Sequence, residues 1–145
     1  MAQYQKTTLE MENNLDSCDN IESFLAENQE RFLDVNASQF LANYLKKKKL
    51  SKAALIRDSG LNQVYAYQIF SGLKHPDRDK LICIAIAAGM TVEETDHLLA
   101  SERKSSLYPR VVRDALIEFA LNHHYTVAQT DDLLYDHDCK TLLNE

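Results

Sequence analysis

The side chains of this sequence that are best suited to chemistry are amides, hydroxyls and amines gathered between positions 50 and 76. The amides of Gln63 and Gln68 can each donate and accept a hydrogen bond, as the edge of adenine requires, and Val64 suits a thymine methyl group. Five nearby residues could anchor the backbone of a nucleic acid through its phosphates: Lys52, Asn62, Ser71, Lys74 and His75. This pattern favours double-stranded DNA as a partner, with Tyr67 as a further base contact; the alternative is a set of solvated polar residues.

Two short helices joined by a tight turn must position these side chains. The segment from Leu50 to Pro76 reads LSKAALIRDSGLNQVYAYQIFSGLKHP. We expect the first helix to begin at Ser51 and the second at Asn62, because its side-chain oxygen can accept a free backbone N–H. Gly60 stands where the turn needs a left-handed residue, and Gly72 where the second helix must stop. This is the layout of a helix-turn-helix, whose second helix can lie in the DNA major groove.

Residues 39–99 resemble the lambda-repressor/Cro type of helix-turn-helix, also called the Xre family. The residues that stand at the positions of the family motif are Leu50, Ser51, Leu55, Gly60, Ile69, Gly72 and Pro76. Asn62 takes the N-cap position of the second helix and Ala66 the buried aliphatic position. The resemblance implies a five-helix all-α bundle and a transcriptional regulator that reads an operator with the helix from Asn62 to Ser71.

The second helix departs from the usual means of reading guanine. No Arg lies between Arg57 and Arg78, so the commonest bidentate guanine contact is missing and the operator sequence stays open. Three aromatic residues, Tyr65, Tyr67 and Phe70, lie on the same helix, and both ends of the chain are acidic. These features favour an alternative function, a protein-interaction module that keeps the fold but has lost tight DNA binding.

The chain divides by composition into four segments. Residues 1–18 are polar and predict a disordered tail, and residues 19–37 predict an acidic helix with Ile21, Phe24, Leu25, Phe32 and Leu33 for its core face. Residues 38–101 form the helix-turn-helix domain, in which the first helix should turn Leu41, Tyr44 and Leu45 inward. Residues 102–145 predict a C-terminal helical extension.

Charge is distributed unevenly along these segments. The net charge of the chain is −6, but residues 38–100 carry nine Lys or Arg against six Asp or Glu, whereas the flanking parts are both acidic. Because the local field governs attraction to phosphate, a basic central section agrees with DNA binding. The acidic N-terminal and C-terminal parts are candidates for contact with a protein partner.

An internal repeat with an offset of 35 residues links the domain to its extension. The segment DKLI at Asp79 corresponds to DALI at Asp114, and TVEETDHLL at Thr91 corresponds to TVAQTDDLL at Thr126. Each copy predicts a helix, a turn and a second helix that opens with a capping box. We therefore expect residues 110–134 to stack a second helical pair on the first.

The extension also predicts a homodimer, because one helix-turn-helix contacts only a half-site. Residues 107–145 hold more apolar side chains than one extra layer of helices needs, namely Leu116, Phe119, Leu133, Leu134, Leu142 and Leu143. The alternative is that these side chains cap the bundle of a monomer.

Other classes of function find little support. The apolar run from Leu81 to Met90 is too short to cross a bilayer, and the N-terminus lacks the features of a secretory signal, so we expect a cytoplasmic protein without membrane partners. Cys18, Cys83 and Cys139 are widely spaced, as in reduced cytosolic proteins. No catalytic motif is present, and the residues near Asp136 and His137 lack a metal-ligand spacing, so we expect no enzyme, metal or cofactor.

Overall fold

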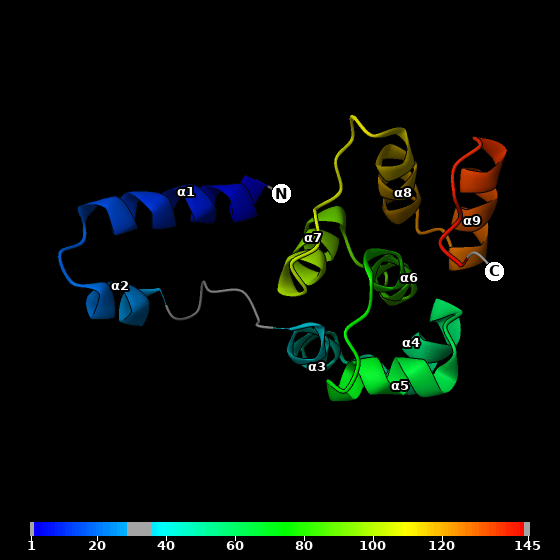
Figure 1. Ribbon diagram of the computed structural model, residues 1–145, viewed down its shortest axis with the longest axis horizontal. Coiled ribbons are helices and arrows are strands. Elements are labelled where there is room, and N and C mark those ends of the chain that lie inside the picture. The colour runs from blue at the N-terminus through cyan, green and yellow to red at the C-terminus, as the bar shows by residue number, and fades with distance from the viewer. Residues whose placement is uncertain (1, 29–35, 144–145) are drawn as a thin grey trace. The chain divides into compact units, whose positions relative to one another are not determined.

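The computed structural model describes residues 2–28 and 36–143, and every regular element within them is an α-helix (Figure 1). This confirms the all-α class expected from the sequence. The chain divides into two compact units, Met1–Leu33 and Asp34–Glu145. No helix of the described residues has the length and apolar character that crossing a membrane requires.

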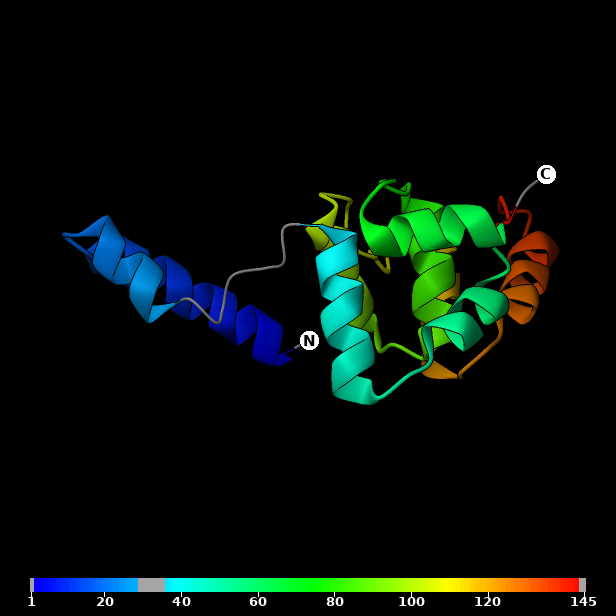
Figure 2. The same cartoon turned by 90° about the horizontal axis from the view of Figure 1, so that it is seen from below.

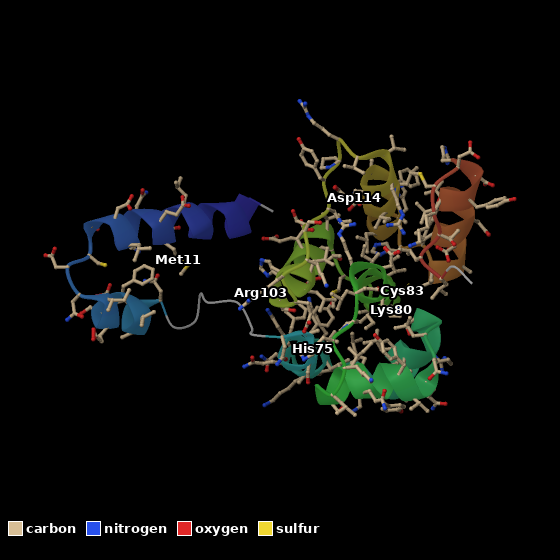
Figure 3. The ribbon with its side chains drawn as sticks, in the orientation of Figure 1. Met11, His75, Lys80, Cys83, Arg103 and Asp114 are labelled. Carbon is tan, nitrogen blue, oxygen red and sulfur yellow. The ribbon has the colours of Figure 1, made fainter. Side chains whose placement is uncertain are left out.

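The first unit begins with α1 (Ala2–Ser17), where the sequence analysis expected a disordered tail. The correction has a local reason: residues 2–17 contain neither Gly nor Pro, and nine of the sixteen are Ala, Gln, Glu, Leu, Lys or Met, which favour helices. Packing adds to this propensity, because α1 contacts the next helix. Met11 is half-buried and lies on the side of α1 that faces α2 (Figure 3).

Helix α2 (Ile21–Glu27) is the expected acidic N-terminal helix, shorter than predicted in its described part. Its N-cap is Asn20, whose side-chain oxygen accepts the backbone N–H of Glu22 at 2.9 Å. Of the expected core face, Phe24 is buried, whereas Ile21 and Leu25 are exposed. Phe32 and Leu33 lie outside the described residues, as does most of the break expected at positions 34–36.

The second unit surrounds one buried helix. Its elements are α3 (Ala37–Lys48), α4 (Lys52–Ser59), α5 (Gln63–Ser71), α6 (Arg78–Ala88), α7 (Val92–Ser101), α8 (Val112–Asn122) and α9 (Val127–Asp136). Every residue of α6 from Leu81 to Ile86 is buried. Figure 1 shows α6 end-on in the middle of this unit, with the other helices around it. Cys83 lies in this core (Figure 3), and burial raises the pKa of its thiol to about 12.

Side-chain caps fix where the helices of the domain begin. Asn36 caps α3, Ser51 caps α4 and Asn62 caps α5, each by accepting a backbone N–H from the first turn. On α3, Leu41 and Tyr44 are buried and Leu45 is half-buried, which confirms the inward face that the sequence predicted. The helices of the second unit therefore begin where local chemistry satisfies the free N–H groups.

The internal repeat is a repeat of structure as well as of sequence. Both predicted capping boxes form, Thr91 with Glu94 at the start of α7 and Thr126 with Gln129 at the start of α9. An aspartate on each second helix accepts the N–H of a buried leucine in the segment that follows the helix. Asp96 binds Leu107 at 2.8 Å, and Asp131 binds Leu142 at 2.6 Å.

The two copies are related by a pseudo-two-fold axis. Arg78 donates to Asp114 at 2.9 Å, and Arg113, which lies 35 positions after Arg78, donates to Asp79 at 3.0 Å. If the second copy were simply translated from the first, Arg113 would pair with an aspartate of a third copy that the chain does not have. The second helical pair therefore packs on the first, as expected, and the exchange of equivalent partners means that the two copies face each other.

The C-terminal extension uses most of its apolar side chains inside the chain. Leu134 and Leu142 belong to the core, while Leu116 and Leu143 are half-buried against it. Phe119 is exposed to 44 % of its surface. The extension thus helps to cover α6, and most of the apolar side chains considered for a dimer contact are used inside the chain.

We predict that Asp114→Ala lowers the free energy of unfolding by about 3 kcal/mol, as expected for one partner of a buried ion pair. Asp114 is buried and accepts hydrogen bonds from Arg78 and from the backbone N–H of Tyr108, and both donors would lose a partner. Urea denaturation followed by circular dichroism measures the change. Asp132→Ala, at an exposed position of α9, is the control and should stay within about 0.5 kcal/mol; equal losses in both variants would contradict the role of the pair.

Candidate nucleic-acid interface

The α4–α5 turn has a fixed local geometry. Gly60 ends α4 in the left-handed conformation with φ of 76°, as the sequence predicted. Ser59 is buried, donates to the carbonyl of Ile56 at 2.7 Å and accepts the N–H of Leu61 at 3.3 Å. At the far end of α5, Gly72 is also left-handed, with φ of 87°. Both glycines therefore stand where L side chains are disfavoured.

One side of α5 is buried and the other is open. Ala66 and Ile69 are fully buried and Phe70 nearly so, which fixes the rotation of the helix. The exposed residues form a stripe that we call the reading face: Gln63, Val64, Tyr67 and Ser71. In Figure 2, α3, α4 and α5 lie in front of the other helices of the second unit. Val64 is 67 % exposed, so its methyl groups are accessible on this face.

The start of α4 lies beside the reading face. The Lys52 ammonium lies 5.5 Å from the centre of the Tyr67 ring, within the range of a cation–π contact. The structure thus brings together a proposed phosphate contact and a proposed base contact that are 15 positions apart in the sequence. A cation at this place can meet phosphate while α5 enters a groove.

Two further candidates, the N-cap of α5 and its last residue, have their polar groups partly engaged. The side-chain oxygen of Asn62 accepts the N–H of Tyr65 at 3.0 Å, so its amide NH2 is the group left to meet phosphate. The Ser71 hydroxyl donates to the carbonyl of Gln68 at 3.1 Å. Gln68 itself is half-buried, whereas Gln63 is exposed. Gln63 is therefore the better placed of the two amides for reading a base.

The segment after α5 holds Lys74 and His75 in different surroundings. Lys74 is exposed, which suits a phosphate contact. Nδ1 of His75 lies 3.2 Å from the carboxylate of Glu102, which also accepts the N–H of Ala37 at 2.7 Å. The Glu102 side chain is 8 % exposed. A buried carboxylate beside His75 opposes attraction to phosphate, so the geometry favours Lys74 over His75 as an anchor.

The run of four lysines ends α3. Lys46, Lys47 and Lys48 occupy its last turn, where the helix dipole favours cations, and Lys49 is the C-cap. Lys48 forms an ion pair with Glu94 at 3.5 Å, and the Tyr44 hydroxyl donates to the same carboxylate at 3.4 Å. Burial, with Glu94 nearby, raises the pKa of Tyr44 to about 12. The position of the run suits a solvated helix end, and its exposed ammonium groups could also meet phosphate.

The aromatic surface that favoured a protein-interaction module is smaller than the sequence indicated. Phe70 is buried and Tyr65 is half-buried, so Tyr67 is the exposed aromatic residue of α5. Tyr65 and Tyr67 differ because successive residues of a helix point about 100° apart. Sequence alone did not separate Phe70 from an exposed aromatic, because α5 is apolar on more than one side.

Two functional features of this region were missed by the sequence analysis. One is the Glu102 carboxylate beside His75, for which no local pattern gives a signal. The other is the contact between Leu143 and the α4–α5 turn, where a Cβ placed on Gly60 would lie 2.6 Å from Leu143 Cδ1. Among the described residues no group of three or more acidic, His or Cys side chains is arranged to hold a metal ion.

Comparisons of this chain with models of protein families, with curated proteins and with solved structures find no match. The features that bear on function are therefore the exposed residues of α5 and the charged residues around them.

Proposed function

We propose that this protein is a sequence-specific DNA-binding transcriptional regulator that reads the major groove with the helix from Asn62 to Ser71. The observation that carries the proposal is the reading face of α5, which exposes Gln63, Val64 and Tyr67 beside Lys52. An amide, an apolar side chain and a hydroxyl are the groups that base edges require, and an adjacent ammonium suits phosphate. The resemblance to the lambda-repressor/Cro type supports the same function.

The alternative, a protein-interaction module, is favoured by two apolar side chains. Val64 is 67 % exposed on the reading face, and Leu73 is 69 % exposed just after α5. Exposed apolar residues near a helix can anchor a protein partner as well as a thymine methyl. The two functions differ in salt dependence, because a DNA complex releases counterions and weakens steeply as salt rises.

We predict that Lys52→Ala and Lys74→Ala each weaken binding to DNA of any sequence and flatten the salt dependence of the affinity by about one unit. Each variant removes one ammonium that would neutralise a phosphate. Fluorescence anisotropy with a mixed-sequence duplex, over a series of salt concentrations, measures the slope.

Arg110→Ala is the charge-matched control for this experiment. Arg110 is exposed in the segment between α7 and α8, outside α4, α5 and the turn that joins them. Its removal should leave the slope unchanged. A protein that shows no salt-dependent binding to any duplex would overturn the proposed function in favour of the interaction module.

We predict that Gln63→Ala weakens binding to the preferred site by about 1–3 kcal/mol and changes binding to mixed-sequence DNA little. The preferred site is first selected from a random duplex library with the unmodified protein. The expected loss is selective because a base contact adds affinity for one sequence alone. Equal losses on both duplexes would show that Gln63 positions the backbone instead.

A homodimer on a two-fold operator remains part of the proposal, because one reading helix covers a half-site. Its contact must now use exposed residues. Val112 and Phe119 lie seven positions apart on α8, hence on one side of the helix, and are exposed to 64 % and 44 %. This stripe replaces the set of leucines considered from the sequence, most of which the chain itself covers.

We predict that the full chain is a dimer by light scattering at tens of micromolar and that Phe119→Asp makes it a monomer. A buried charge without a partner disfavours an apolar interface. Tyr135→Asp is the control, since Tyr135 is 75 % exposed on α9 and should leave the mass unchanged. A monomeric unmodified chain would exclude the dimer without touching the DNA proposal.

A further inference from the structure

We infer that the second repeat is a brace for the reading helix, in which Asp131 holds the segment 137–143 so that Leu143 packs on Gly60 and fixes the start of α5. The inference rests on the proposed function and adds Asp131 and Leu143 as positioning residues for base recognition.

Asp131 holds the C-terminal segment by its backbone. One carboxylate oxygen accepts the N–H of Leu142 at 2.6 Å, and the other accepts the N–H of Leu143 at 3.1 Å. Hydrogen bonds to an ionised carboxylate are stronger than those between neutral groups. After α9 the described residues up to 143 contain turns and no helix, and Asp138 adopts a left-handed conformation with φ of 60° where the segment turns back.

Leu143 contacts the α4–α5 turn at Gly60. A Cβ placed on Gly60 would lie 2.6 Å from Leu143 Cδ1, closer than real Cβ contacts. Leu143 is half-buried against the core, and its neighbour Leu142 is 4 % exposed. Since α5 begins three residues after Gly60, a side chain packed against this turn limits how α5 can tilt.

The first repeat shows that this contact is particular to the second copy. There, Asp96 accepts the N–H of Leu107, the equivalent of Leu142. Tyr108 is the equivalent of Leu143, but it is 54 % exposed and its N–H goes to Asp114 instead. Both copies thus share the hydrogen bond from aspartate to leucine, but in the second copy the next side chain, Leu143, lies against the α4–α5 turn.

A brace of this kind should affect discrimination more than general affinity. Base contacts depend on the tilt of α5 within fractions of an ångström, whereas phosphate attraction is longer in range and tolerates small shifts. Loosening the turn should therefore reduce the preference for the selected site while leaving the salt dependence on mixed-sequence DNA unchanged.

The experiment compares four variants of the full chain: Leu143→Ala, Leu143→Met, Asp131→Asn and Asp132→Asn. Leu143→Ala and Asp131→Asn should each lower the ratio of affinities for preferred and mixed-sequence duplexes about tenfold, the size of one lost base contact. Leu143→Met keeps the volume and should restore the ratio. Asp132→Asn is the charge-matched control on α9 and should leave the ratio unchanged. An unchanged ratio in Leu143→Ala would overturn the brace.

A double-mutant cycle tests the contact without DNA, so failure of the brace and failure of the proposed function can be told apart. The variants are Gly60→Ala, Leu143→Ala and both together, and urea unfolding gives the equilibrium constant for each. Gly60→Ala strains the backbone whether residue 143 is Leu or Ala, but the added Cβ can clash with residue 143 only when that residue is Leu. The factor by which Gly60→Ala lowers the folding equilibrium constant should be about tenfold smaller when Leu143 is already Ala. Additive effects would show that Leu143 does not press on the turn.

Discussion

The structure of the second unit depends on the burial of α6. Its residues from Leu81 to Ile86 are all buried, so this helix has no side that can face water. A helix that is apolar all round must be enclosed by other elements. Helices α4 and α7 contact two of its sides, and α9 contacts a third. The C-terminal extension is accordingly part of the core, and truncation before it would expose α6.

Enclosing α6 places two equivalent helices beside each other with the same polarity. The N-terminal ends of α6 and α8 exchange the pairs Arg78–Asp114 and Arg113–Asp79, and their C-terminal ends line a common shallow pocket. Parallel helix dipoles repel, but Asp79 and Asp114 lie in the first turns, where negative charge is favourable. The duplicated sequence thus supplies the charged side chains that link the N-terminal ends of these two helices.

The same arrangement leaves α5 with one side free. The core takes Ala66, Ile69 and Phe70 and turns Gln63, Val64 and Tyr67 outward, with Lys52 beside them. The buried side of α5 belongs to the core and the helix contacts α3 and α4, while Leu143 contacts the turn that precedes it. A regulator built this way would keep its base contacts in register through residues that never touch DNA.

Local chemistry by itself determined the helices and much of the candidate site. N-caps at Ser51 and Asn62, left-handed Gly60 and Gly72, and both capping boxes could be predicted because each involves residues within a few positions of one another. The helix over residues 2–17 was missed because its composition resembles that of a polar tail.

Tertiary structure decided which apolar residues are covered: Leu134 is buried while Phe119 is exposed, although both suit a helix core. It also decided the pseudo-two-fold pairing, the Glu102 carboxylate beside His75 and the contact of Leu143 with Gly60. These contacts join residues from 27 to 83 positions apart, and their formation depends on how whole helices pack, which no local pattern encodes.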